Sequence, residues 1–228
     1  MKLGRRPLFA LALAFAAPSL GLTPASAADW AGHYGDVLLS FTPGPVPTHV
    51  ARRDSLPVVG TLVDLYALLA VPEVVRASGE QVLTVGGIEL KLAVDGAPGW
   101  KVLEQKISGK HINVGPEPGT VTAGLSPGLS FEDGMVQVAH WVVQVPGLAR
   151  DVVFRLDPAG ARSCAGLPGC GESGTFALWA GAVAANQHGL LFSSGYVPAY
   201  LNPSQPEPDL TPRRGTVGWR ERGLVTPD

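Results

Sequence analysis

One stretch of the sequence matches the pattern of a serine hydrolase nucleophile, Gly124-Leu125-Ser126-Pro127-Gly128. In that pattern the serine lies on a tight turn between a strand and a helix, and the backbone N–H of the next residue forms part of the oxyanion hole. Here the next residue is Pro127, which has no N–H. The residues that follow are turn-rich and do not favour a helix. We therefore interpret Ser126 as part of a surface turn and predict no catalytic residue.

The only two cysteines, Cys164 and Cys170, lie in the stretch CAGLPGC. Five residues separate them, which is too many for a Cys-x-x-Cys redox pair. A structural zinc site needs four Cys or His ligands, and no histidine lies at a suitable spacing. The glycines and the proline between the thiols favour a tight loop. In an oxidising compartment these features predict a Cys164–Cys170 disulfide, with two free thiols as the alternative.

The other polar residues show no pattern of a metal or phosphate site. Five histidines are scattered without the H-E-x-x-H or facial-triad spacing. No calcium-loop or phosphate-loop pattern occurs, although a calcium ion in the loop at Asp133 or Asp95 stays open. His140, beside Trp141, is interpreted as a hydrogen-bonded structural residue. We predict no metal and no cofactor.

Tryptophan could stack on a sugar ring, because its indole offers a flat apolar face. Trp141 and Trp179 lie inside apolar runs and are predicted to be in the core. Trp100 follows the turn residues Ala97-Pro98-Gly99, which makes it the candidate ligand-binding residue. The sequence does not identify the ligand.

The N-terminus has the three parts of a secretory signal. Met1–Arg6 is basic, Leu8–Ala17 is an unbroken apolar run, and Ala25–Ala27 offers the small residues of a cleavage site. The apolar run is well short of the ~20 residues that span a bilayer. We expect cleavage between Ala27 and Ala28, export to the periplasm or the medium, and no membrane anchor in the mature chain. The adjacent arginines leave both the general and the twin-arginine export routes open.

Removal of residues 1–27 makes the chain more acidic. The segment carries three basic and no acidic residues, so the formal charge changes from −2 to −5. Nucleic-acid binding rewards clustered Lys and Arg, and an anionic membrane attracts basic segments. We therefore expect neither of them as a partner.

The elements that must position these residues are predicted to be short β-strands. The chain contains 29 Gly and 21 Pro, which separate short apolar runs. The clearest strand is Ile88–Val94, where every second residue is apolar, as in a sheet with one buried face. The flanking pairs Gly86-Gly87 and Asp95-Gly96 indicate turns.

Further apolar runs are also predicted to be strands. They are Asp36–Phe41, Val58–Val71, Trp100–Gln105, Thr120–Ala123, Met135–Val145, Val152–Leu156, Phe176–Ala184 and Leu190–Ser193. Val58–Val71 also fits helical spacing, and we favour a strand because its surroundings are β. Asn186–Gly189 indicates a hairpin turn between the last two strands.

These strands predict a single all-β domain, an antiparallel β-sandwich or jelly roll. It would span residues 28–201, between a signal peptide at 1–27 and a Pro-rich, disordered or loosely attached tail at 202–228. The succession VVGTLVDLYALL, GGIELKLAVDGA, MVQVAHWVV and VVFRLD resembles the strand order of cohesin-like domains, which are similar to some carbohydrate-binding modules. The resemblance covers about residues 35–200. It implies non-catalytic attachment to a secreted or surface protein or to a glycan, and it assigns no binding residue.

We therefore expect an exported, non-catalytic β-sandwich for binding or attachment. One alternative is a structural envelope or surface component that self-assembles, which an exposed and unprotected edge strand would favour. The other is an exported hydrolase with an unrecognised carboxylate site, because the separation of two carboxyl groups is a property of the folded chain.

Overall fold

The computed structural model describes residues 37–44, 46–52, 61–70, 84–132, 135–147, 149–157, 177–184, 187–193, 196–205 and 218–221, with only the backbone described for 177–184, 187–193 and 218–221. Within these ranges the chain forms strands and no helix. The strands are β1 (Val37–Ser40), β2 (Val50–Ala51), β3 (Thr61–Ala70), β4 (Thr84–Asp95), β5 (Lys101–Ile107), β6 (His111–Asn113), β7 (Thr120–Ser130), β8 (Met135–Val145), β9 (Val152–Asp157), β10 (Ala177–Ala184), β11 (Gln187–Ser193), β12 (Tyr196–Val197), β13 (Ala199–Leu201) and β14 (Gly218–Glu221). The predicted signal peptide and the two cysteines lie outside the described residues.

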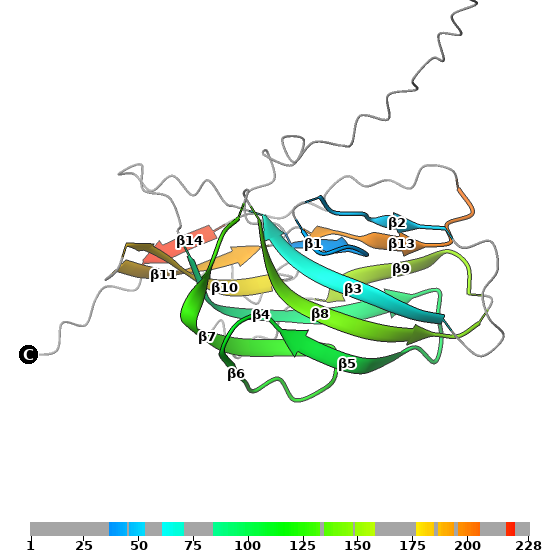
Figure 1. The fold of residues 1–228 in the computed structure, drawn as a ribbon, viewed down its shortest axis with the longest axis horizontal. Coiled ribbons are helices and arrows are strands. Elements are labelled where there is room, and N and C mark those ends of the chain that lie inside the picture. The colour runs from blue at the N-terminus through cyan, green and yellow to red at the C-terminus, as the bar shows by residue number, and fades with distance from the viewer. Residues whose placement is uncertain are drawn as a thin grey trace, which may run out of the picture.

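The strands form two sheets that lie one over the other (Figure 1). A five-stranded sheet has the order β12-β1-β3-β8-β5. A nine-stranded sheet has the order β14-β11-β10-β4-β9-β13-β2, and β7 pairs with β4 and carries β6 on its other side. Most neighbours are antiparallel, while β1 with β12 and β13 with β2 are parallel. The prediction of an all-β sandwich is confirmed.

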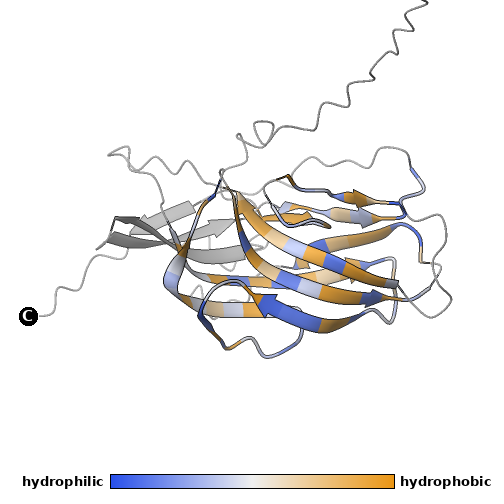
Figure 2. Ribbon diagram, viewed as in Figure 1, coloured by the Kyte–Doolittle hydropathy of each residue, from blue (hydrophilic) through white to orange (hydrophobic). Residues whose placement is uncertain are grey.

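The core lies between the sheets because alternate side chains of each strand point inward. Inward residues of β3, β8 and β4 join one apolar cluster, whose largest fully buried side chains include Trp141 and Phe154 at 0% exposure. Figure 2 shows polar residues interspersed among apolar ones along β3 and β8. The pattern recognised in Ile88–Val94 places Ile88, Leu90 and Leu92 in this core.

Several predicted strands agree with the structure. Met135–Val145 is β8, and Ile88–Val94 lies within β4. The described part of Val58–Val71 is strand β3, so the preference for a strand over a helix is confirmed. Gly86-Gly87 was expected to be a turn, but both residues lie inside β4. A β-bulge at this place, where the register with β7 shifts between Val85 and Gly87, accommodates the glycines.

The prediction of a surface turn around Ser126 is wrong. The stretch Gly124–Gly128 lies within β7, which runs from Thr120 to Ser130. The register between β4 and β7 jumps from Gly124 to Leu129, so Pro127 falls in a bulge and needs no donor to β4. Ser126 itself donates its backbone N–H to the carbonyl of Lys110 at 3.0 Å. The nucleophile pattern therefore occurs on an extended strand, without the turn and helix that a nucleophile elbow requires.

One prediction near the C-terminus is also corrected. Asn186–Gly189 was expected to be the turn of a hairpin, but β11 already begins at Gln187 and the hairpin closes between Ala184 and Gln187. Within the segment expected to be a loose tail, β14 pairs antiparallel with β11. Local composition does not reveal that Gly218–Glu221 pairs with β11, because strand addition depends on a free edge elsewhere in the fold.

His49 is a buried histidine, 5% exposed, whose Nδ1 lies against the carbonyl of Leu39. Burial lowers the pKa of His49 from its usual 6.5, and the contact with Leu39 opposes this only in part. The unfolded chain then binds more protons than the folded one below about pH 6.5, so the free energy of unfolding should fall as the pH falls through that value.

We expect this loss of stability to be larger in the wild type than in His49→Gln, which has no titrating ring. Urea unfolding at about pH 7.5 and about pH 5.5 measures it, because the two proteins share every other titrating group. An equal loss in both proteins would assign the acid sensitivity to other residues.

Candidate interaction surface

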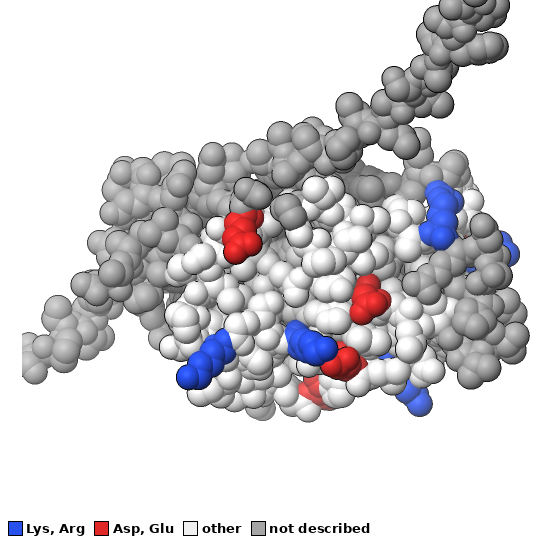
Figure 3. Space-filling model, viewed as in Figure 1, with Lys and Arg blue, Asp and Glu red and all other residues white. Residues whose placement is uncertain are grey.

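Charged side chains are few on the face that β3, β8 and β5 cover, and both signs occur there (Figure 3). Lys106 Nζ lies 2.7 Å from Glu104 Oε1, and the two side chains are 63% and 50% exposed. Exposed pairs of this kind contribute little to stability. The arrangement indicates an ordinary solvated surface with no field of a single sign.

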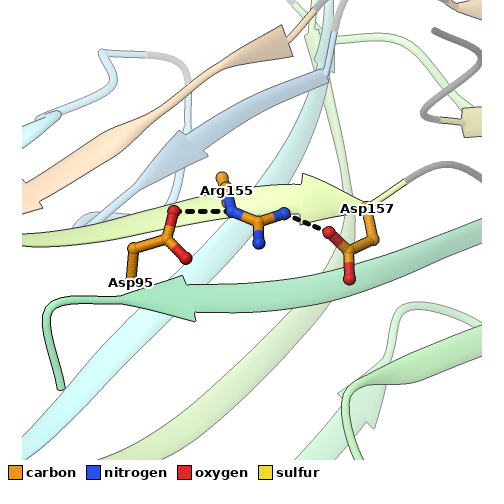
Figure 4. Close-up of polar contacts among 3 residues, drawn as sticks. All are labelled: Asp95, Arg155 and Asp157. Atoms are coloured by element: carbon orange, nitrogen blue, oxygen red, sulfur yellow. Dashed lines mark hydrogen bonds and ion pairs between the residues drawn. The ribbon is translucent and has the colours of Figure 1, made fainter. Parts of the chain in front are cut away.

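A group of ion pairs joins the C-terminal parts of β4 and β9 (Figure 4). Arg155 Nε donates to Asp95 Oδ2 at 2.7 Å, and Arg155 also pairs with Asp157 through Nη1. The hydrogen bond to Asp95, followed by that to Asp157, raises the pKa of Arg155. The three side chains satisfy one another and join two neighbouring strands, so we assign them a structural role.

His140 lies on the outer face of the five-stranded sheet. Its Nε2 is 2.8 Å from Asp64 Oδ1, and its ring stacks on Tyr66 with centroids 4.5 Å apart. These contacts join β3 and β8, which agrees with the interpretation of His140 as a hydrogen-bonded structural residue. Among the described residues, no group of three or more His, Cys, Asp or Glu side chains is placed to hold a metal ion.

Trp100 lies directly before β5, where its backbone N–H donates to the carbonyl of Ala97 at 3.1 Å. Its side chain is half-buried and packs against the central core cluster. This packing covers part of the side chain, and the role of Trp100 in ligand binding stays a prediction. The predicted sites at Ala27, Ala28, Cys164 and Cys170 lie outside the described residues.

Two grooves are found in the described part of the molecule. The larger, of about 540 Å³, is lined by residues that include Pro43, Gly44 and Met135, and Glu132 is its one charged lining residue. The smaller, of about 330 Å³, lies between β5 and the loop Gly115–Pro118. It is lined by the exposed carboxylates Glu104 and Glu117, of which Glu104 is paired with Lys106.

A row of small residues crosses the outer face of the nine-stranded sheet. The register aligns Ile112 of β6 with Gly124 of β7, Gly124 with Gly87 of β4, and Gly87 with Ala180 of β10. Ala123 and Leu125, on either side of Gly124, and Ile88, next to Gly87, are buried in the core, so Gly124 and Gly87 face outward. We call Gly124, Gly87 and Ala180 the small-residue row, and Ile112 of β6 adjoins it. A Cβ placed on Gly124 would meet no heavy atom within 4 Å, which shows that the surface there is open.

Exposed aliphatic side chains border this row. Ile112 and Val114 are 75% and 70% exposed, the highest values among the large hydrophobic residues of the described chain. Val114 lies beside Thr122, to whose carbonyl it donates its N–H at 2.9 Å, and Thr122 aligns with Glu89. Oε2 of Glu89 is buried and has no hydrogen-bond partner among the described residues. Sequence reasoning did not single out these residues, because their adjacency exists only in the folded sheet.

Two side-chain amides hold the β6–β7 hairpin in place. Oδ1 of Asn113 accepts from the backbone N–H groups of Gly115, at 3.0 Å, and Thr122, at 3.1 Å. Gln105 of β5 accepts from Gly119 N at 2.9 Å and donates to Thr120 O at 3.1 Å. The exposed face of the hairpin is therefore presented by a fixed backbone.

Within the described residues no helix is long and apolar enough to cross a membrane. No protein-family model matches the chain, and no curated protein sequence matches it. Among solved structures the chain is similar to the seventh ScaB type I cohesin from Pseudobacteroides cellulosolvens, with 12% sequence identity and a TM-score of 0.42, over 77% of this chain and 96% of that chain. That protein is named a cohesin, and the strand order of this sequence resembles that of cohesin-like domains. The sandwich fold stated above rests on the two sheets and their shared core.

Proposed function

We propose that the protein is an exported, non-catalytic β-sandwich that binds a secreted or surface protein through the outer face of β6, β7 and β4. The observation that carries the proposal is the small-residue row with its exposed neighbours Ile112 and Val114. Apolar side chains grouped on an open surface are typical of sites where another protein docks. Export rests on the signal-like N-terminus at residues 1–27.

The shape of this face favours a protein over a glycan. Sugar rings are bound mainly by flat aromatic faces, whereas Ile112 and Val114 are aliphatic. At Gly124 the surface above the backbone is open, so a partner can approach the sheet closely there.

A second function, self-assembly of an envelope or surface component, is favoured by a different observation. β6 is an edge strand with exposed apolar side chains, and an edge of this kind is a template for pairing with another chain.

Gly124→Arg tests the docking face, because the site has room for a side chain and a long cation would obstruct an apolar contact. The matched control is Leu62→Arg, since Leu62 is 54% exposed on the outer face of the other sheet. Immobilised mature protein is exposed to the exported proteins of the source culture, each retained protein is identified and purified, and its dissociation constant is measured. We expect Gly124→Arg to weaken binding at least about 10-fold, which corresponds to about 1.4 kcal/mol, and Leu62→Arg to leave it unchanged.

Equal binding by both variants would contradict the assignment of the docking face. Binding on a glycan array that Gly124→Arg abolishes would replace the protein partner by a glycan. Steady multiple-turnover hydrolysis of a polymer or ester by the purified protein would contradict a non-catalytic role.

A further inference from the structure

The free side of β6 exposes an unpaired strand edge. Among the described strands β6 pairs only with β7, and the hydrogen bonds Ser126 N to Lys110 O and Val114 N to Thr122 O fix the alternation. Residues 110, 112 and 114 direct their backbone groups toward β7, so His111 and Asn113 direct theirs away from it. Among the described residues nothing pairs with the backbone of His111 or Asn113 on that side.

The side chains of His111 and Asn113 do not block this edge. The imidazole of His111 is held by its own hairpin, with Nδ1 2.9 Å from the carbonyl of Gly109. Oδ1 of Asn113 is engaged by Gly115 N and Thr122 N. The backbone N–H groups and carbonyls of His111 and Asn113 are therefore accessible to an added strand.

The neighbouring edge strand β5 shows how this protein protects an edge. β5 carries three exposed charged residues, Lys101, Glu104 and Lys106, and its register with β8 shifts between Val102 and Glu104. Charges and bulges are the usual means of preventing edge-to-edge pairing. β6 has no charged residue and no bulge in its register with β7, and Ile112 is 75% exposed.

We propose that β6 pairs antiparallel with β6 of a second copy of this chain, forming a two-fold dimer. With the axis at Ile112, His111 of each copy lies opposite Asn113 of the other, and each such pair exchanges two backbone hydrogen bonds. Ile112 then lies opposite Ile112 of the second copy as a non-hydrogen-bonded pair, where side chains are closest. Lys110 lies opposite Val114 of the second copy, so no like charges meet.

The second copy is the occupant that this edge fits best. The residues at the axis are identical and apolar, which self-pairing requires, and a two-fold interface uses the same patch on both subunits. Pairing of β6 with β6 consumes both bare edges, so assembly stops at the dimer. The patch is small compared with the roughly 1,200 Å² that a specific interface buries, and we therefore expect a dissociation constant above about 10 μM.

Sedimentation equilibrium of the mature protein over a range of concentrations tests the dimer. His111→Pro removes the outward N–H and leaves the bonds to β7 in place, so we expect at least about a 10-fold rise in the dissociation constant. His111→Ala is the matched control, because it removes the same side chain and keeps the N–H, and it should dimerise like the wild type. Circular dichroism confirms that both variants are folded.

Ile112→Lys provides an independent test. The substitution leaves the backbone bonds between β6 and β7 in place and puts two like charges at the dimer axis, so this variant should be monomeric. A wild type that stays monomeric at all concentrations overturns the proposal, and so does a dimer that survives both His111→Pro and Ile112→Lys. Loss of the dimer in His111→Ala would also overturn it. The dimer goes beyond the docking function, because a monomeric His111→Pro that still binds its partner would separate the two surfaces.

Discussion

Replacing Trp141 with alanine is expected to lower the free energy of unfolding by about 3–5 kcal/mol. Trp141 is 0% exposed at the centre of β8, which pairs with β3 on one side and β5 on the other. Its removal would leave a cavity at the centre of the five-stranded sheet, and the residues around it belong to well-paired strands that can collapse only in part.

Chemical denaturation of the mature protein measures this loss as a shift of the midpoint at constant slope. Val142→Ala is the matched control, because Val142 follows Trp141 in β8 and points to the outer face, where it is only half-buried. Its replacement should cost less than about 1 kcal/mol. If the two variants were equally destabilised, Trp141 would not occupy the core position described here.

Gln105→Leu is expected to cost about 2–4 kcal/mol, although the substitution adds apolar surface. Oε1 of Gln105 accepts from Nε1 of the buried Trp141, and from the backbone of Gly119, each at 2.9 Å. Each donor left without a partner in the interior costs about 1–3 kcal/mol. Gln144→Leu is the control, because Gln144 is half-buried on the outer face of β8 and its change should be nearly neutral.

A double-mutant cycle isolates the contribution of the indole N–H. In a Trp141→Phe background one of the donors is already absent, so Gln105→Leu should cost less than it does in the wild type. The difference between the two costs should be about 1 kcal/mol, the usual contribution of one hydrogen bond. Identical costs in both backgrounds would show that the bond between Trp141 and Gln105 does not stabilise the fold.

Much of the fold could be predicted because it follows from local residue patterns. The alternation in Ile88–Val94 and in Met135–Val145 reports which side chains turn inward, and this pattern repeats along the chain. The apolar run of Met135–Val145 predicted a buried Trp141. The abundance of Gly and Pro predicted short strands, but β3, β4, β7 and β8 have 10 to 12 residues each.

The errors occur where a residue's neighbours come from elsewhere in the chain. Pro127 and Gly128 were predicted to form a turn, but a bulge opposite β4 accommodates them within β7. Asn186–Gly189 was predicted to be a turn, but β11 already begins at Gln187 because it pairs with β10.

The amino-acid sequence by itself predicts a β-sandwich, because the burial of alternate side chains is a property of each strand. The sequence also carries a signal-like N-terminus and lacks a working nucleophile at Ser126, since Pro127 has no N–H. The tertiary structure decided the candidate interaction surface. Ile112, Gly124 and Gly87 come from three strands. Long-range pairing fixes the strand register, which makes these residues neighbours on one face. The same pairing leaves one edge of β6 without a partner among the described strands.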